Sequence, residues 1–326
     1  MAEAQQSPEA APLVADDTVV DETFDDGDSA LELGAASDST SIRSSILKYR
    51  EENGRTYHAY KDGTYVLPND EVENERLDLQ HHLFLLTFDE KLHVAPLTKP
   101  LRRAFDAGCG TGIWAIEFAD QHPECECPPN VAFYVDDLEE SWDFSTKFDF
   151  IFARFLTGSI RDWPKFFRQS FEFLNPGGTI ELIDIVYPLK SDDDTLSEDS
   201  PLCKWSTLLL SAFTANGSPL DSALKYKDQL EEAGFVNINI VKRKWPLNQW
   251  PKDQKHKQIG AWAYANTLDA LAALSLAVFT RPVGQGGLGW GNDELEVFLA
   301  GVRKDLKNPK IHSYWPIWSV YATKPE

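Results

Sequence analysis

The residues best suited to chemistry form a short glycine-rich stretch, Asp106-Ala107-Gly108-Cys109-Gly110-Thr111-Gly112, between an apolar segment and a helix-forming one. Glycine at every second position leaves no β-carbon between the backbone and a molecule above the turn, and it permits positive φ. A helix that begins directly afterwards points its unpaired N–H groups at the same place. The stretch therefore predicts a nucleotide-type binding loop.

The spacing of the glycines indicates the kind of nucleotide. In a dinucleotide-binding loop the third glycine stands three residues after the second. Here Gly112 stands two residues after Gly110, so a nicotinamide-dependent oxidoreductase fits poorly. With Asp106 ahead of it, the loop resembles the S-adenosylmethionine loop of class I methyltransferases. That resemblance implies that Asp106, Gly108 and Gly110 bind the methionine end of the cofactor, with Cys109 between the two glycines.

Strand-like and helix-like segments alternate from Leu101 onward, which predicts an α/β fold with a Rossmann-like parallel sheet and helices on both faces. After a strand ending at Asp106, further strands are expected over 130–135, 148–153, 179–185, 236–245 and 314–323, the last two pairing antiparallel. Helices are expected over 114–121, 163–174, 201–215, 222–233, 253–279 (broken once) and 293–306. The helix over 201–215 is an insertion that could enclose a substrate, and residues 176–178 predict a turn.

Two segments are expected ahead of this methyltransferase-like domain, which spans 101–326. Residues 1–45 are rich in acidic residues, Ala and Ser and poor in aromatics, which predicts a disordered acidic arm. Residues 46–100 predict an N-terminal helical lid, with a short helix over 42–52, a β-prone stretch over 57–67 and a longer helix over 70–88. Asp70 is the expected N-cap of that longer helix.

Composition excludes several classes of partner. The net charge of −21 argues against general binding of nucleic acid or of a membrane surface, because both favour a basic face. Four cysteines in 326 residues do not make a disulfide framework. No secretory signal is visible at the N-terminus, and the longest apolar run, over 268–279, is too short to span a bilayer. We therefore expect a soluble cytoplasmic or nuclear protein that is not secreted.

Further segments resemble the LaeA-like fungal methyltransferases. They are 69–71, 76–82, 154–163, 176–182, 191–196, 303–306 and 314–317. The resemblance covers residues 57–324 and implies an enzyme or regulator of fungal secondary metabolism that moves a methyl group from a sulfonium to an O, N, C or S nucleophile. It leaves open whether the acceptor is a small molecule or a protein, and whether a regulatory protein is a partner. The Asp-Pro-Pro type of motif of nucleic-acid methyltransferases is absent, because Ala153-Arg154-Phe155-Leu156 stands there.

The same resemblance assigns further cofactor contacts. Asp137 and Leu138 match the position that contacts adenine, although Asp137 could equally be a plain strand-end cap. Arg154 lies where the carboxylate or reaction centre would be, and Tyr65 on the lid could cover the cofactor. The adjacent histidines 81 and 82 could supply a base for a hydroxyl substrate or simply pack on their helix.

Other groups carry weaker signals. Two thiolates in Cys125-x-Cys127, without a second pair or a nearby histidine, make a poor zinc site, so no metal is expected. Scattered aromatic residues could line an apolar pocket, although such residues are more often core. They are Trp205, Phe213, Trp262 and Trp290.

The chain departs from the class I pattern after its first helix. In that class a second strand follows and ends on an acidic residue that binds both ribose hydroxyls. Only three residues separate Cys127 from Val131, whereas the crossover between two parallel strands needs about a dozen residues. One inner strand, together with its acidic residue, is therefore expected to be missing. The missing segment would be about fifteen residues long. Either the coding sequence is incomplete, or the lesion is real and the chain is a non-catalytic regulatory scaffold. Glu124 or Glu126 could substitute for the ribose acid.

Overall fold

The computed structural model describes residues 9–16, 50–52, 55–57, 70–99, 101–123, 125, 130–285 and 287–326. Tyr65 and most of the expected acidic arm lie outside these residues. Within the arm, residues 9–16 lie against the chain near Trp250, where Ala15 pairs with Pro251 and the Asp16 N–H donates to the Trp250 carbonyl at 2.7 Å.

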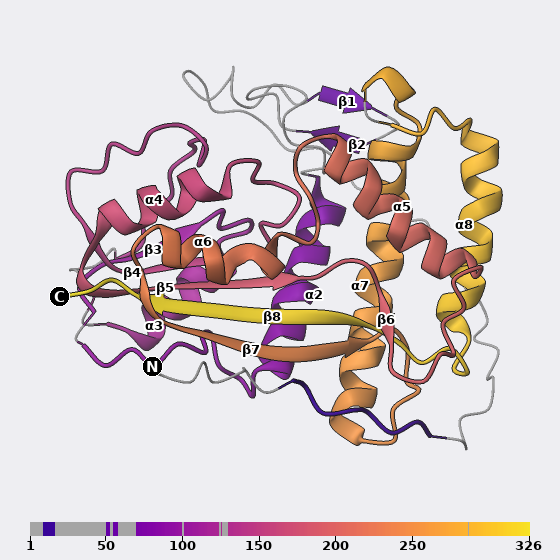
Figure 1. Ribbon diagram of the computed structural model, residues 1–326, viewed down its shortest axis with the longest axis horizontal. Coiled ribbons are helices and arrows are strands. Elements are labelled where there is room, and N and C mark those ends of the chain that lie inside the picture. The colour runs from indigo at the N-terminus through magenta and orange to yellow at the C-terminus, as the bar shows by residue number, and fades with distance from the viewer. Residues whose placement is uncertain are drawn as a thin grey trace.

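Six strands form one mixed sheet (Figure 1). The parallel strands are β3 (Ala104–Ala107), β4 (Phe148–Arg154) and β5 (Leu174–Ile185). Antiparallel to β5 runs β8 (Ser313–Thr323), which also pairs with β7 (Val236–Pro246) and with the short β6 (Lys190–Ser191). The predicted antiparallel pairing of the last two long strands is confirmed, with Trp245 opposite Trp315. The expected turn over 176–178 lies inside β5, where Gly177 has a φ of 73°.

The helices follow the predicted periodicity closely. They are α2 (Glu71–Thr87), α3 (Ile113–Gln121), α4 (Trp163–Phe173), α5 (Pro201–Ala215), the 3-10 turn Ser222–Lys225 with α6 (Tyr226–Glu232), α7 (Gln254–Phe279) and α8 (Asn292–Lys307). Asp70 caps α2 as predicted, since its carboxylate accepts from the Glu73 N–H at 3.0 Å.

Three local predictions are wrong. The helix α7 is continuous over 26 residues: Gly260 does not break it but lets its backbone approach the Asn248 carbonyl, which a β-carbon would meet at 2.1 Å. The described end of the helix expected over 42–52 is instead strand β1 (Arg50–Glu52), paired with β2 (Arg55–Tyr57). In the sequence the two strands flank an Asn-Gly dipeptide, the strongest short hairpin signal.

The third error concerns residues 130–135, which the sequence predicts as a strand and which are irregular. Phe133, Tyr134 and Val135 have exposed fractions of 56%, 81% and 70%. β-propensity expresses how a side chain fits a half-buried pleated surface, and these side chains find none. Within the described sheet, β3 therefore pairs with β4 alone.

The helices cover both faces of the sheet, as predicted, and alternate residues of β4 divide between two cores. Phe150 and Phe152 face the larger core with α2, α3, α5, α7 and α8, whereas Ile151 and Ala153 face the smaller one with α4 and α6. Figure 1 shows α5, α7 and α8 gathered at the end of the sheet where β5 finishes. These helices therefore enclose the edge at which parallel strands present their carboxyl ends, the usual place for a ligand in such folds.

Candidate functional site

The glycine loop joins β3 to α3 through three residues in the left-handed region. Gly108, Gly110 and Gly112 have φ values of 75°, 56° and 80°, which glycine adopts without strain. A β-carbon at Gly108 would lie 2.6 Å from Cδ2 of Leu156. The loop is therefore fitted closely to the residues that follow β4.

Two opposite charges stand together at the ends of adjacent strands, Asp106 on β3 and Arg154 on β4. Asp106 is partly accessible as a residue, but its Oδ2 is buried and has no hydrogen-bond partner in the described part of the chain. Burial raises the pKa of Asp106 to about 7, against the opposing effect of Arg154. Burial likewise lowers the pKa of Arg154 to about 10, although Asp106 and Glu117 raise it.

Helix α2 positions Arg154. The Arg154 Nη2 group donates to Nδ1 of His81 at 2.9 Å, and Nε2 of His81 lies 2.9 Å from a carboxylate oxygen of Glu117 on α3. The guanidinium also lies over the Phe84 ring, 4.8 Å from its centroid. His81 is thus buried between two charged groups and bonds to both.

The same helix also touches the glycine loop. The Thr111 hydroxyl donates to the Asp78 carboxylate at 2.7 Å, and a β-carbon at Gly110 would lie 3.5 Å from the Leu77 side chain. Cys109 is half-buried, and burial raises the pKa of its thiol. The residues predicted from the loop and from Arg154 therefore lie in one region of space, next to α2.

Asp137 and Leu138 have a different environment. The Asp137 carboxylate accepts from the Glu139 N–H at 2.9 Å, which is the geometry of a local cap. Leu138 packs into the smaller core, and its carbonyl accepts from the indole N–H of Trp142 at 3.1 Å. Their predicted contact with adenine stays a prediction. Phe133 lies closer to the loop, since a β-carbon at Gly112 would meet its ring at 2.6 Å.

A cavity of about 60 Å³ lies beside this space, between α2, α5, α7 and the ends of β4 and β5. Two of the aromatic residues expected to line a pocket, Trp205 and Phe213, do line it. The other two do not: Trp262 packs on His82, with ring centroids 4.9 Å apart, and Trp290 packs on Phe279. Sequence alone gave no means of telling these pairs apart.

One wall of the cavity is polar but electrically neutral. Arg76 and Glu73 form a two-point ion pair, Nε to Oε2 at 2.9 Å and Nη2 to Oε1 at 2.6 Å, and both residues are buried. A third donor, Nη1 of Arg76, bonds the Asn266 side chain on α7 at 2.8 Å. Because the two charges cancel, the cavity suits a neutral group better than a charged one.

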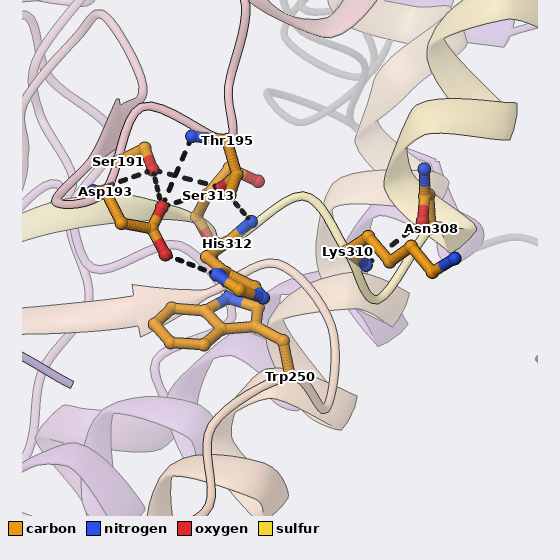
Figure 2. A network of polar contacts seen from close by, with 8 residues as sticks. All are labelled: Ser191, Asp193, Thr195, Trp250, Asn308, Lys310, His312 and Ser313. Atoms are coloured by element: carbon orange, nitrogen blue, oxygen red, sulfur yellow. Dashed lines mark hydrogen bonds and ion pairs between the residues drawn. The ribbon is translucent and has the colours of Figure 1, made fainter. Parts of the chain in front are cut away.

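A second polar cluster lies where β6 approaches the start of β8 (Figure 2). Asp193 accepts hydrogen bonds from the hydroxyls of Ser191 and Thr195, each at 2.8 Å, and pairs with Nδ1 of His312 at 2.5 Å. The His312 ring lies 4.9 Å from that of Trp250. Both hydroxyls donate to the carboxylate rather than to the imidazole, so no nucleophile is activated by a base. The cluster fastens one of the family-like segments to β8.

The described residues limit other possibilities. None of their helices combines the length and the apolar content needed to cross a bilayer. They contain no group of three or more His, Cys, Asp or Glu side chains that could hold a metal ion.

Comparison with known proteins identifies the family of the chain. A methyltransferase domain family matches residues 79–240. The probable methyltransferase tdiE of Emericella nidulans is 35% identical over 300 residues, covering 87% of this chain and 92% of that protein. The secondary metabolism regulator LAE1 of Cochliobolus heterostrophus is 35% identical over 295 residues, covering 84% of this chain and 94% of that one.

Among solved structures, phosphoethanolamine N-methyltransferase 2 of Haemonchus contortus, in complex with S-adenosyl-L-methionine, is 15% identical with a TM-score of 0.41, over 81% of this chain and 55% of that one. The chain belongs to the methyltransferase family and is related to the LaeA-like proteins of fungal secondary metabolism. The family model and these relatives confirm the predicted family and the S-adenosylmethionine cofactor class. The α/β sheet with helices on both faces confirms the predicted fold class.

Proposed function

We propose that this chain transfers a methyl group from S-adenosylmethionine to an O or N nucleophile of a small molecule or a protein in fungal secondary metabolism. The observation that carries the proposal is the pair formed by Arg154 and Asp106, whose buried Oδ2 has no hydrogen-bond partner among the described residues. The methionine end of the cofactor carries an ammonium and a carboxylate. Asp106 would accept from the ammonium, and Arg154 would bind the carboxylate.

The cofactor, when bound, supplies an electrophilic methyl group whose leaving group is neutral. The protein therefore needs little acid catalysis, and its main task is to hold the nucleophile in line and to exclude water. Helix α2 and the helical insertion α5 serve this task by enclosing the carboxyl end of the sheet. The cavity lined by Trp205 and Phe213 supports a neutral, largely apolar acceptor. Cytoplasmic or nuclear location stays a prediction, as does the absence of nucleic-acid substrates.

Titration calorimetry with S-adenosylmethionine and its demethylated product tests the proposal. We expect the unaltered chain to bind both, and Asp106→Asn to bind at least about tenfold more weakly, because a hydrogen bond between charged groups is worth about that factor. Asp120→Asn is the matched control, since Asp120 is exposed near the end of α3. No heat at millimolar ligand with the unaltered chain would refute the proposal.

A second candidate is a methyltransferase-like scaffold without turnover, with regulatory partners. It is favoured by one observation, that β3 has a single neighbour in the described sheet and residues 130–135 form no strand. If the adenosine half of the site is incomplete, free methionine should displace S-adenosylmethionine at similar concentrations. A preference of a hundredfold or more for the whole cofactor, or turnover with any acceptor, would rule the scaffold out.

A further inference from the structure

We infer that His81 is a positioning residue that, backed by Glu117, holds Arg154 away from Asp106 so that both charges face the methionine end of the cofactor. The inference rests on the proposed function, because it assigns Arg154 to the ligand carboxylate. It goes beyond that function by giving a role to His81 and Glu117, two residues on different helices that are 36 positions apart.

The proton on His81 follows from its neighbours. A guanidinium can only donate, so Nδ1 of His81 must accept the hydrogen bond from Arg154 with its lone pair. The ring proton is then on Nε2, which donates to the Glu117 carboxylate at 2.9 Å. The ring is neutral, and both of its nitrogens are engaged. His81 therefore has no nitrogen left to take a proton from an acceptor.

The unpartnered oxygen of Asp106 shows what the arrangement achieves. Arg154 is near enough to affect the titration of Asp106, yet no hydrogen bond from it reaches the buried Oδ2. Opposite charges attract strongly where water is excluded, so an unrestrained guanidinium would close onto that carboxylate. His81 on one side and the face of Phe84 on the other hold it in place instead. If Arg154 and Asp106 bonded to each other, neither charge would be free to bind the ammonium or the carboxylate of the ligand.

The surroundings of His81 keep it neutral. Its charged neighbours are Arg154 on β4, Glu117 on α3 and Asp78 on its own helix. Burial and then Arg154 lower the pKa of His81, and the two carboxylates only partly oppose them. A second ring proton would place an N–H against the Arg154 N–H, so the contact requires the neutral form.

Three substitutions separate the two bonds of His81. In His81→Asn the amide oxygen can take the place of Nδ1 and accept from Arg154, while the contact with Glu117 is lost. In His81→Gln the amide reaches the place of Nε2 and Glu117, but nothing accepts from Arg154. His81→Leu removes both bonds. The matched control is His82→Asn, because His82 is on the same helix and contacts Trp262 instead.

Titration calorimetry with S-adenosylmethionine and thermal melting of each variant provide the test. We expect His81→Asn to bind within about threefold of the unaltered chain, and His81→Gln and His81→Leu to bind at least about tenfold more weakly. His82→Asn should not change the affinity. If His81 has a purely structural role, its substitutions lower the melting temperature, but His81→Asn and His81→Gln bind the cofactor with equal affinity. Equal affinity of the unaltered chain and His81→Leu overturns the inference alone, whereas no binding by the unaltered chain overturns the proposed function with it.

The pH dependence gives a second readout. Protonation of Asp106 weakens binding in every variant as the pH falls through about 7, so the ratio of two affinities is compared. Burial and Arg154 lower the pKa of His81, so the ring takes a second proton only at a pH below the ordinary histidine range. The affinity of the unaltered chain relative to His81→Asn should therefore be constant at neutral pH and fall only in more acidic solution. A ratio that falls already between pH 8 and pH 7, or that rises as the solution becomes acidic, contradicts the need for a neutral ring.

Discussion

Replacing Asp106 by asparagine should make the protein more stable while it weakens cofactor binding at least about tenfold. The carboxylate is buried beside Arg154 with one oxygen unpartnered, so its charge is destabilising until a ligand cation arrives. Asparagine has nearly the same shape and carries no charge. Stabilisation on loss of function is what a site built for binding, rather than for folding, should show.

The magnitude follows from the pKa. In the folded chain the pKa of Asp106 is about 7, raised by burial from 3.8. Between these two values the folded state binds more protons than the unfolded state, so stability falls as the pH rises, and it levels off above about 7. Each pH unit in this window is worth about 1.4 kcal/mol. From pH 5.5 to pH 8 the free energy of unfolding of Asp106→Asn should therefore gain about 2 kcal/mol on that of the unaltered chain.

Urea denaturation of both proteins at the two pH values measures this difference. Glu181 and Asp184 also have pKa values raised to about 7 by burial, but they are present in both proteins and cancel in the comparison. Asp120→Asn, the exposed control, should show no pH-dependent gap. A gap that stays constant or narrows with rising pH would refute the reasoning, because Asp106 would then not be held at an energetic cost.

Three further outcomes test other parts of the structure. Gly108→Ala should lose cofactor binding and about 1–3 kcal/mol of stability, since its β-carbon would meet Leu156 at 2.6 Å. The control is Gly217→Ala, because Gly217 has a φ of +85° and open space around it, so this variant measures the cost of backbone strain alone. Ala273→Leu should fill the cavity, abolish acceptor turnover and leave cofactor affinity unchanged in calorimetry. Burial raises the pKa of Asp193, but hydrogen bonds from His312, Thr195 and Ser191 outweigh it and hold that pKa below its usual range. Asp193→Ala should therefore lower the free energy of unfolding by about 1 kcal/mol or less at pH 7. In thermal melts this difference should disappear as the pH falls below 4.

Local signals in the sequence were enough for most of the elements. The Asp70 cap, the apolar spacing of α5 and the paired β7 and β8 all depend on near neighbours or on regular alternation. Residues 130–135 failed because β-propensity does not say whether a neighbouring strand exists to pair with. In α7, Gly260 could equally mark a break or a close approach, and only the carbonyl of Asn248 decides between them.

The candidate site divides in the same way. Asp106 and Arg154 could be assigned to the cofactor from the sequence through the family resemblance. In the structure they lie together because the ends of parallel strands meet at one edge of the sheet. Glu117 could not be found, since its contact with His81 depends on how α2 lies against α3. No spacing in the sequence encodes that contact. The partners that orient a functional group are therefore less visible than the group itself.

Helix α2 has a larger role than the lid that the sequence suggested. Asp78 and His81 face the glycine loop and Arg154, whereas Glu73 and Arg76 face the cavity and Asn266 on α7. Side chains three positions apart share a helix face, so Asp78 and His81 lie on one face of α2, and Glu73 and Arg76 lie together one turn earlier. A single helix therefore carries both pairs. A rotation of α2 would therefore move the residues that contact Arg154 and the residues that line the cavity together. A substitution that loosens α2 should therefore lower the affinity for the cofactor and the selectivity for the acceptor together. If the two properties change independently, the two pairs of residues on the helix act separately.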